Sequence, residues 1–422
     1  MKIKSIISTG QGRLHLMDSA IAIKKAGVEV KVITGWVPSE RISDKFINFL
    51  GSLVGRNNLV YGLQKRRSIN IESKELFSCA FSEFLIQFLF ILSKFKLLKR
   101  ESAAVIGWKV FGWQSKKYIK KADIFHVRSG AGHGKAIEKA REGGMIILAD
   151  HSAAHPKEIH KQLSKAYNES NIPFNPNSGF WKMVLDDCNK ADFVLVNSNY
   201  VKKTFINNGF KSNLLYVIPL GIRNDFFNLK SNYKKNKTLK LLFTGSINKW
   251  KGVHLIIEAA KVLNSKNILI EIDFIGSVSN EIQIPIFLNN HTLLKFHGHL
   301  PQDQLKSYLT NADIYIFPSY CEGSAQSLKE AMAAGLPVIA TEQSGAPIIH
   351  GENGWIIPDN SSDDIVNAII LLSNDEALCE RLGQNANKTI RTEHTWEKYG
   401  ENVANLYTSL LLEKNKNSNA KK

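Results

Sequence analysis

The chain has 422 residues, which exceeds the roughly 250–300 residues that a single hydrophobic core supports, so one domain is excluded and two are expected. Its 44% hydrophobic and 22% charged residues are ordinary for a globular protein. The formal net charge of +17 lies wholly in the first half: residues 1–220 hold 34 Lys and Arg against 17 Asp and Glu, whereas residues 221–422 hold 21 of each.

This segregation of charge favours an anionic partner for the first half of the chain. Nucleic acid, an anionic membrane surface and a phosphorylated acceptor all fit a positive charge of this size. The alternative is that the lysines serve only solubility. A nucleic-acid partner is the least favoured, because the positive half has neither aromatic interleaving nor a recognisable binding module.

The four cysteines and the chain start indicate the compartment. Cys79, Cys188, Cys321 and Cys379 have neither metal-ligand spacing nor the arrangement of a disulfide framework, so a reducing compartment fits and no metal site is expected. The chain begins directly with the strand-like run 3–8, not with a signal peptide. No apolar run reaches the roughly 20 residues that span a bilayer. We therefore expect a cytoplasmic protein, which could extend to the inner face of the cell membrane.

Strands and helices alternate along the first half, which is typical of a parallel sheet. A strand leads into the glycine turn Gly10–Gly12, which resembles a phosphate-binding turn but is a weak signal alone. The predicted strands that follow span 28–34, 123–127, 145–149 and 191–196, and the predicted helices span 14–26, 134–142 and 199–208.

The segment 81–100 differs from the rest of the first half. It carries Phe84, Phe88 and Phe90 and ends in the basic residues Lys94, Lys96, Lys99 and Arg100. One interpretation is an interfacial helix on anionic lipid, to which the basic run 65–67 could add charge. The other is a buried helix of the first domain. The charge of the first half favours the membrane.

A second α/β series follows the polar stretch 228–237, which we interpret as a linker. The predicted strands span 239–243, 269–275, 294–296, 314–318 and 338–340, and the predicted helices span 253–263, 304–310 and 327–334. A further helical pattern starts at Thr395 and runs to Leu412.

The strongest chemical signal is the run from Pro318 to Thr341. A loop after the strand presents Glu322 at the carboxyl edge of the sheet, where open α/β sheets bind ligands. The helix that begins near Ser327 offers unpaired amides to an anion such as a diphosphate. Glu330 lies on its first or second turn, so both carboxylates could bind hydroxyls of one elongated ligand. Taken alone, the pair is better explained as a solvated loop and a helix-capping glutamate, and the ligand-binding interpretation depends on the residues around it.

This block resembles the paired-glutamate motif of family 4 (group 1) retaining glycosyltransferases with the GT-B fold. The resemblance is specific over about 239–410, and it includes Gly245, Lys251-Gly252, 311–313, 344–345 and 351–359. In the first half it is weaker and rests on 10–12, 150–151, 191–198 and 218–221.

The resemblance implies two doubly wound parallel-sheet, Rossmann-like domains that face a central cleft. Residues 1–222 would bind the acceptor and residues 223–394 the nucleotide sugar. The helix at about 395–413 would pack back onto the first domain, and 414–422 would form a disordered tail.

The same resemblance implies roles for single residues. Glu322 would hold the hydroxyls of the donor sugar, Glu330 would hold the ribose, and Lys251 would neutralise the leaving diphosphate. The expected donor-binding residues are Gly245, Ser246, Lys249, Lys251, Gly276, His299, Leu300, Glu322, Gly323, Ser324, Ala325, Ser327, Leu328 and Glu330.

Three positions depart from the family pattern. Ser246 stands where the family usually has arginine, and Lys249 could reach the phosphates instead. Ser324-Ala325 replaces the usual Phe-Gly pair, as in some polysaccharide-assembly members, and the added Cβ could shift the sugar. Arg223 replaces the usual aspartate.

In the first half, four residues are candidates. His151 follows a predicted strand, is expected to face the cleft, and matches the family histidine that contacts the donor sugar. Together with Glu322 and Lys251 it forms the predicted catalytic set. Gly12, His155 and Ser198 are expected to serve the acceptor or the loops of the first domain.

The predicted activity is retaining transfer of a sugar from a UDP- or GDP-sugar to an acceptor hydroxyl, in bacterial cell-surface polysaccharide or glycolipid synthesis. The expected acceptor is lipid-linked or a polysaccharide, and no cofactor, metal ion or nucleic acid is expected. Two alternatives stay open: a nucleotide-sugar epimerase of the same fold, and a non-catalytic relative that binds sugar nucleotides.

Overall fold

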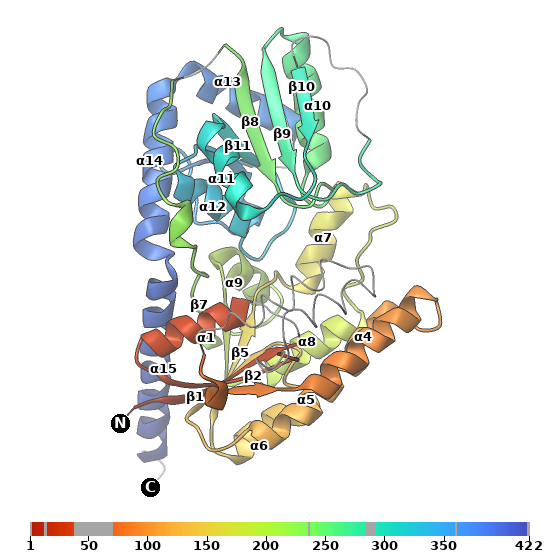
Figure 1. Cartoon of the computed structure of the whole chain (residues 1–422), viewed down its shortest axis with the longest axis vertical. Helices are drawn as coiled ribbons and strands as arrows, with labels where there is room; N and C mark the ends of the chain where they lie inside the picture. The colour runs from red at the N-terminus through yellow and green to blue at the C-terminus, as the bar shows by residue number, and fades with distance from the viewer. Residues whose placement is uncertain are drawn as a thin grey trace, which may run out of the picture.

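The chain folds around two parallel β-sheets, one in each half. The computed structural model describes residues 2–11, 15–37, 71–234, 237–283, 292–358 and 361–419. Within them, the first sheet has seven strands in the order β3-β2-β1-β4-β5-β6-β7, and the second has six in the order β10-β9-β8-β11-β12-β13. The two sheets occupy the lower and upper parts of Figure 1. Strand order reverses at the first strand of each sheet, so the prediction of two doubly wound α/β domains is confirmed.

The first domain alternates strands and helices as the sequence predicts. Its strands are β1 (Lys4–Gly10), β2 (Glu29–Thr34), β3 (Leu76–Ser78), β4 (Ile124–Arg128), β5 (Ile146–His151), β6 (Phe193–Val196) and β7 (Leu215–Val217). Its helices are α1 (His15–Lys25), α4 (Ala80–Lys94), α5 (Arg100–Ser115), α6 (Ala136–Glu142), α7 (Pro156–Ala166), α8 (Gly179–Lys190) and α9 (Asn199–Ile206).

The second domain repeats this pattern. Its strands are β8 (Leu239–Thr244), β9 (Ile270–Ile275), β10 (Thr292–Phe296), β11 (Ile314–Phe317), β12 (Val338–Thr341) and β13 (Trp355–Ile357). The helices that follow in the chain are α10 (Val253–Ser265), α11 (Gln302–Asn311), α12 (Gln326–Ala334), α13 (Ser362–Asn374), α14 (Glu376–Glu393) and α15 (Trp396–Asn419).

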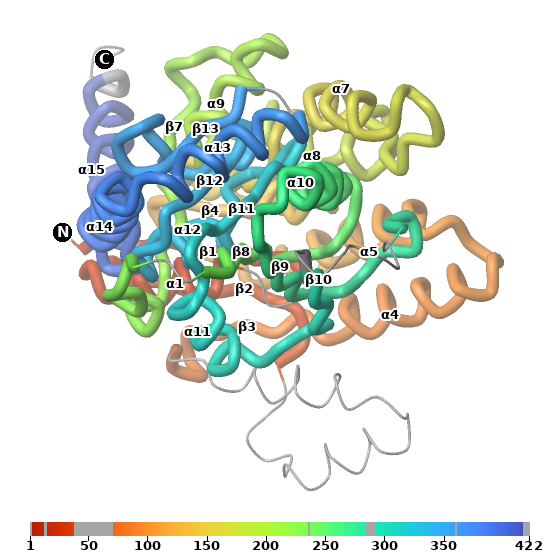
Figure 2. The backbone as a smooth tube through the Cα atoms, turned by 90° about the horizontal axis from the view of Figure 1, so that it is seen from above, coloured from red at the N-terminus to blue at the C-terminus, as the bar shows by residue number. Residues whose placement is uncertain are grey.

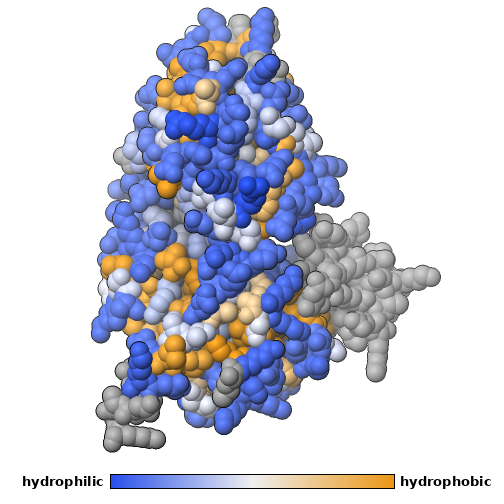
Figure 3. Space-filling view, turned by 90° about the vertical axis from the view of Figure 1, so that its left-hand side faces the viewer, coloured by the Kyte–Doolittle hydropathy of each residue, from blue (hydrophilic) through white to orange (hydrophobic). Residues whose placement is uncertain are grey.

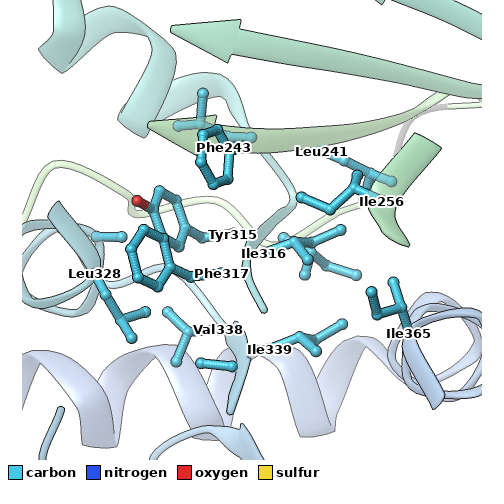
Figure 4. Close-up of a cluster of buried hydrophobic side chains, with 14 of the residues drawn as sticks. Leu241, Phe243, Ile256, Tyr315, Ile316, Phe317, Leu328, Val338, Ile339 and Ile365 are labelled. Atoms are coloured by element: carbon cyan, nitrogen blue, oxygen red, sulfur yellow. The ribbon is translucent and has the colours of Figure 1, made fainter. Parts of the chain in front are cut away.

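The core of the second domain explains why its strands form. Leu241, Phe243, Tyr315 and Phe317 come from the central strands β8 and β11, and each is at most 2% exposed (Figure 4). Phe243 and Phe317 stack with ring centroids 5.8 Å apart. Strands buried on both faces by helices are apolar throughout, and this accounts for their apolar sequence. The core therefore holds the carboxyl ends of β8 and β11 in fixed positions.

The last helix, α15, leaves the second domain and packs along α1 of the first. Its Tyr399, Val403 and Tyr407 are at most 1% exposed and belong to the same core cluster as strands of the first sheet. We expected a disordered tail from 414 onward, but the helix continues to Asn419. Its last turns contain Leu, Glu and Lys, which favour helix, and nothing in the sequence breaks it. Along this side hydrophilic residues cover most of the surface, with hydrophobic patches in both domains (Figure 3).

The chain crosses between the domains twice at one place. Ile222 pairs with Thr395 in a parallel bridge, and the amide of Ile222 donates to the carbonyl of His394 at 2.7 Å. The fully buried Lys329 of α12 donates from Nζ to the carbonyl of Leu220 at 2.9 Å. Both connections are thus tied to each other and to the helix that follows the Glu322 loop.

Candidate functional site

The Glu322 loop lies at the carboxyl edge of the second sheet, between the end of β11 and the start of α12. The amide of Glu322 donates to the carbonyl of Gln343 at 2.8 Å, and the amide of Ala325 donates to the carbonyl of Ser344 at 3.0 Å. These two bonds tie the loop to the segment after β12. Among the described residues no side chain caps the N-terminus of α12, whose N-cap residue is Ala325, so its first amides are available to an anion.

Lys251 and Glu322 form the central charged pair of the site. The Nζ of Lys251 contacts the Oε1 of Glu322, and both side chains are largely buried. The hydroxyl of Ser319 donates to the same Oε1 at 2.7 Å. These residues are 71 positions apart in the sequence, and they meet because β8 and β11 are neighbouring strands. Two residues that we assigned to the sugar and to the diphosphate therefore lie side by side.

Two further residues hold this loop, and the sequence analysis did not identify them. The indole Nε1 of Trp250 donates to the carbonyl of Cys321 at 2.6 Å. The carbonyl of Ser319 accepts from the hydroxyl of Thr341 at 2.6 Å. Trp250 directly precedes Lys251, and Ser319 follows Pro318 just after the end of β11, so their neighbours in the sequence were the available signal.

Glycines form the turns at the carboxyl ends of the next strands. Gly245 and Gly276 have φ angles of +142° and +146°, which residues other than glycine rarely adopt. A Cβ on Gly276 would lie 1.8 Å from the carbonyl oxygen of Gly245, so the two turns can pack this closely only because residue 276 is glycine. Ser246 and His299 are exposed beside them, and Leu300 is half-buried. Backbone and the exposed side chains of Ser246 and His299 consequently line this edge.

Glu330 lies on α12 with its side chain half-buried. Burial raises the pKa of its carboxyl to about 7, although Arg223 and Lys329 act in the opposite direction. On the turn before it, the hydroxyl of Ser327 donates to the carbonyl of Thr244 at 3.1 Å, and Leu328 is fully buried in the core. Because the side chain of Leu328 is buried, this residue could contact a ligand only through its backbone.

Lys249 does not lie with Lys251 in this structure. Its amide donates to the Oε1 of Glu281 at 2.9 Å, and its Nζ lies 5.7 Å from the ring centroid of Tyr167 in the first domain. The hydroxyl of Tyr167 donates to Glu281 at 2.9 Å. Lys249 therefore belongs to a contact between the end of α7 and the second domain, whereas Lys251, two residues further on, contacts Glu322.

The two domains touch at the Glu322 loop. The hydroxyl of Ser198, which caps α9, donates to the carbonyl of Gly323 at 2.5 Å. A Cβ on Gly323 would lie 1.8 Å from the carbonyl oxygen of Ser152. Ser324 is half-buried and Ala325 buried next to it. The first domain consequently closes over the loop through backbone and a single hydroxyl.

His151 lies at the carboxyl end of its strand, as predicted, and it is buried. It is the last residue of β5 and is only 3% exposed, and its contact with the donor sugar stays a prediction. Its register with Val196 continues the sheet, and its ring lies 4.9 Å from that of Phe205, which explains the burial. Burial lowers its pKa to about 4. Ser129 Oγ lies 2.9 Å from its Nδ1, and its buried Nε2 has no hydrogen-bond partner among the described residues.

The remaining first-domain candidates have different outcomes. His155 is 4% exposed, and its Nδ1 accepts from the amide of Lys157, so it caps α7; its role toward the acceptor or the first-domain loops stays a prediction. Gly12 lies outside the described residues.

No group of three or more His, Cys, Asp or Glu side chains that could hold a metal ion occurs in the part of the chain that the structure describes. No described helix is long and apolar enough to cross a membrane.

Comparisons with known proteins agree with this geometry. The family model for glycosyl transferases group 1 matches residues 225–389. The amylovoran biosynthesis glycosyltransferase AmsK of Erwinia amylovora is 30% identical over 275 residues, which are 61% of this chain and 62% of that protein. The match thus spans less than two thirds of the Erwinia protein. The uncharacterized glycosyltransferase MJ1069 of Methanocaldococcus jannaschii is 30% identical over 282 residues, which are 63% of this chain and 68% of that protein.

The crystal structure of Anabaena Alr3699/HepE in complex with UDP is similar over nearly the whole chain. It superposes with a TM-score of 0.58 at 16% identity, and the match covers 97% of this chain and 100% of that one. This likeness confirms the predicted GT-B fold.

Proposed function

Because this chain belongs to the group 1 glycosyltransferases, we propose that it moves a sugar from a UDP- or GDP-sugar to an acceptor hydroxyl with retention at the anomeric carbon. The observation that carries the proposal is the contact of Lys251 with Glu322 at the carboxyl edge of the second sheet, beside the uncapped start of α12. A cation, a carboxylate and free amides at one edge match the parts of a nucleotide sugar.

Donor binding would exchange this ion pair for two new contacts. Lys251 would turn to the diphosphate, and Glu322 would accept hydrogen bonds from the sugar hydroxyls. The hydroxyl of Ser319 and the bond from the Glu322 amide to Gln343 would hold the carboxylate in place during the exchange. The ion pair of Lys251 with Glu322 keeps both charges satisfied before the exchange, so neither pays the cost of an unpaired buried charge.

Glu330 would bind the ribose. Its carboxyl has a pKa raised to about 7 by burial, so it is partly protonated near neutral pH. A ribose hydroxyl that donates to the carboxylate would favour the ionised form. Donor binding at this position is therefore expected to depend on pH.

The transfer step requires that charge on the leaving diphosphate be stabilised. The bond from the anomeric carbon to the phosphate oxygen breaks while the acceptor oxygen attacks from the same face. The acceptor proton passes to the departing diphosphate oxygen, so no protein nucleophile is needed. Lys251 and the first amides of α12 would stabilise the diphosphate as its charge grows, which is commonly the largest catalytic contribution. His151, at the end of β5, would meet a sugar hydroxyl with its unpartnered Nε2.

The acceptor and the need for cofactors follow from the same reasoning. A surface polysaccharide or a lipid-linked precursor is our proposed acceptor, supported by the polysaccharide role named for the Erwinia relative. Since Lys251 and the helix amides supply positive charge to the diphosphate, we expect transfer to persist in the presence of EDTA and without added cofactor.

The deciding experiment measures release of UDP or GDP from a panel of nucleotide sugars, with Glu322→Ala alongside. We expect release from one donor and its loss in the variant. Glu352→Ala, at an exposed glutamate of the same domain, is the matched control and should keep full activity. Equal release by wild type and Glu322→Ala would remove the site assignment. An inverted anomeric product, seen by NMR, would contradict retention.

A further inference from the structure

Helix α4 exposes its hydrophobic residues and buries polar ones. Its buried residues are Ser82, Glu83 and Ile86. Phe81, Phe84 and Phe88 are more than half exposed, and Ile91 is 49% exposed. These four residues are three or four positions apart, so they form one stripe along the helix. A helix of a globular protein normally orients its apolar stripe inward, and α4 does the reverse.

The orientation of α4 is fixed by contacts on its inner side. The carbonyl of Ser82 accepts from the amide Nε2 of Gln11 at 2.9 Å, and the amide of Ser82 donates to Gln114 at 2.9 Å. Ile86 packs directly over Gly107 of α5, where a Cβ would lie 2.6 Å from it. Because these contacts hold the inner face, the helix cannot rotate to bury its phenylalanines.

Basic residues surround this apolar stripe. Residues 80–121 contain nine Lys and Arg against two Asp and Glu, and one of those two, Glu83, is buried. The turn between α4 and α5 exposes Phe95 and Leu97, at 72% and 74%, among the exposed Lys94, Lys96 and Lys99. Helices α4 and α5 and the turn between them form a hairpin, which lies at the outer side of the first domain in both views (Figures 1 and 2).

The base of the hairpin contains an open hollow of about 780 Å³. Its lining includes the aromatic side chains of Phe81 and Trp113 and the lysines Lys116, Lys117 and Lys139. Trp113 is 59% exposed. An apolar wall with cations at its rim fits an acyl chain that ends in a phosphate-bearing headgroup.

The start of α5 is connected to the Glu322 loop through the start of α8. Glu101, in the first turn of α5, accepts a hydrogen bond from the amide of Gly179 at the start of α8. In the segment before α8, the ring of Phe174 lies 6.0 Å from that of Trp250, whose indole bonds to Cys321. A surface bound by the hairpin is thus connected to the edge of the donor site through a short series of contacts.

We propose that the hairpin α4–α5 is the surface by which this protein docks on a bilayer rich in anionic lipid. The stripe from Phe81 to Phe95 would enter the boundary between headgroups and acyl chains, and Lys94, Lys96, Lys99 and Arg100 would bind the headgroup phosphates. A second copy of this chain is the less favourable occupant, because two such basic faces would repel each other. The inference rests on the proposed function in one respect: it delivers a lipid-linked acceptor to the cleft.

The test is co-sedimentation of the full chain with vesicles of phosphatidylcholine alone or with about 30% phosphatidylglycerol. We expect at least about tenfold tighter binding to the anionic vesicles, and weaker binding as salt rises from about 0.1 M to about 0.5 M. The variant K94Q/K96Q/K99Q/R100Q should lose this preference. The variant F84S/F88S/I91S should lose binding to both kinds of vesicle by about tenfold or more.

Matched controls carry the same changes elsewhere on the surface. K261Q/K266Q/K388Q/R391Q removes four exposed charges from the second domain, and I206S/L371S/L412S removes three exposed apolar side chains. Both should bind like wild type. Equal binding of wild type to both vesicles, or loss in the controls equal to that in the hairpin variants, would overturn the proposal. So would hairpin variants that change only the oligomeric state or capture of an acidic protein.

Donor release without acceptor separates this inference from the proposed function. The hairpin variants should release UDP or GDP like wild type, because their substitutions are remote from Lys251 and Glu322. Vesicle binding that depends on the hairpin in a protein without donor release would contradict the proposed function alone. Donor release in a protein that ignores vesicles would contradict the docking surface alone.

Discussion

The two domains share one architecture and differ in how they treat charge. Residues 1–220 carry the whole excess of +17, and the first domain exposes a stripe of phenylalanines. Residues 221–422 have no net charge, and the second domain buries Phe243, Phe274 and Phe317 in its core. The second domain nevertheless holds the charged pair Lys251 and Glu322 at its carboxyl edge. A neutral, well-packed frame positions a few charges with little competition, while a basic surface attracts a large anionic partner.

Their buried ionisable groups differ in the same way. In the first domain, Asp150 lies between His15 and His126, at 3.1 Å from each. Burial alone would raise the pKa of Asp150, but the two histidines hold it below its usual range. In the second, burial lowers the pKa of Lys329 to about 7, and its Nζ donates only to a carbonyl. In the first domain the buried carboxylate of Asp150 has two histidine partners. In the second domain the buried ammonium group of Lys329 has the neutral carbonyl of Leu220 as its partner, where the chain crosses between the domains.

The largest effect should come from Lys251→Ala. If the second domain supplies the positive charge for the diphosphate, this change should lower kcat by about 100- to 1000-fold, as losses of comparable electrostatic groups do. Lys249→Ala is the matched control, because its Nζ lies over Tyr167 and not at Glu322. Steady-state kinetics with the preferred donor measures both.

A larger loss of kcat in Lys249→Ala than in Lys251→Ala would contradict the assignment of Lys251 to the diphosphate. The diphosphate would then be bound at the contact between α7 and the second domain. A thermal melt of each variant tests whether lost activity reflects unfolding instead.

The next largest effect concerns the place where the domains meet. In Gly323→Ala, the new Cβ would meet the carbonyl oxygen of Ser152 at 1.8 Å, and neither backbone can yield easily. The domains should separate slightly, and a misplacement of about 1 Å can cost roughly 100-fold in rate. Nucleotide affinity, which depends on the second domain, should change little. Calorimetry and transfer assays on the same protein separate the two; a matching loss of affinity would show that the loop itself had collapsed.

Much of the fold could be predicted, because each domain follows a simple alternation of β-branched strands and amphipathic helices. The start of α12 at Gln326 lies within one residue of the expected position, since the strand, loop and glycine signals around it are local. The burial of His151 was not predictable, because it depends on Phe205 from another element. For α4, the sequence left a buried and an interfacial helix open and favoured the interfacial one, and the contacts with Gln11 and Gly107 show which side faces outward.

The direct contact of Lys251 with Glu322 could not be predicted either. The sequence places each residue after a strand, but only the order of β8 and β11 in the sheet makes them neighbours. Their assignment to different parts of the donor stays a prediction, and the variants above test it.

A smaller effect should appear as a pH dependence of donor binding. Glu330 has a pKa raised to about 7 by burial, and ribose binding would favour its ionised form. Affinity for a nucleotide sugar should therefore rise between about pH 6 and pH 8, by up to about tenfold. A nucleotide sugar is the better probe than UDP, whose terminal phosphate itself titrates in this range. In Glu330→Gln the dependence should vanish; an unchanged slope would place the titrating group elsewhere.

The same group makes a signed prediction for stability. The folded pKa of Glu330 lies above the usual value of 4.5, so the folded protein binds more protons than the unfolded chain between these values. Its contribution to stability is therefore lost as pH rises from about 4.5 to about 7. Glu330→Gln should melt at a higher temperature than wild type at pH 8 and at a similar temperature at pH 4. A variant that is less stable at pH 8 would contradict the burial argument.

The smallest effect should come from a contact on the outer rim of the two domains. Lys203 of α9 pairs with Glu342 after β12 at 3.0 Å, but both side chains are more than half exposed. Solvent screens such a pair, so Lys203→Gln should change transfer by less than about threefold, and added salt should erase even that difference. The conserved-charge variant Lys203→Arg is its control. A large loss in Lys203→Gln that Lys203→Arg restores would mean that surface charge, and not the backbone contact at Gly323, holds the domains together. Charge on the first domain would then act at the domain contact as well as on an outside partner, which the comparison of the two domains does not allow.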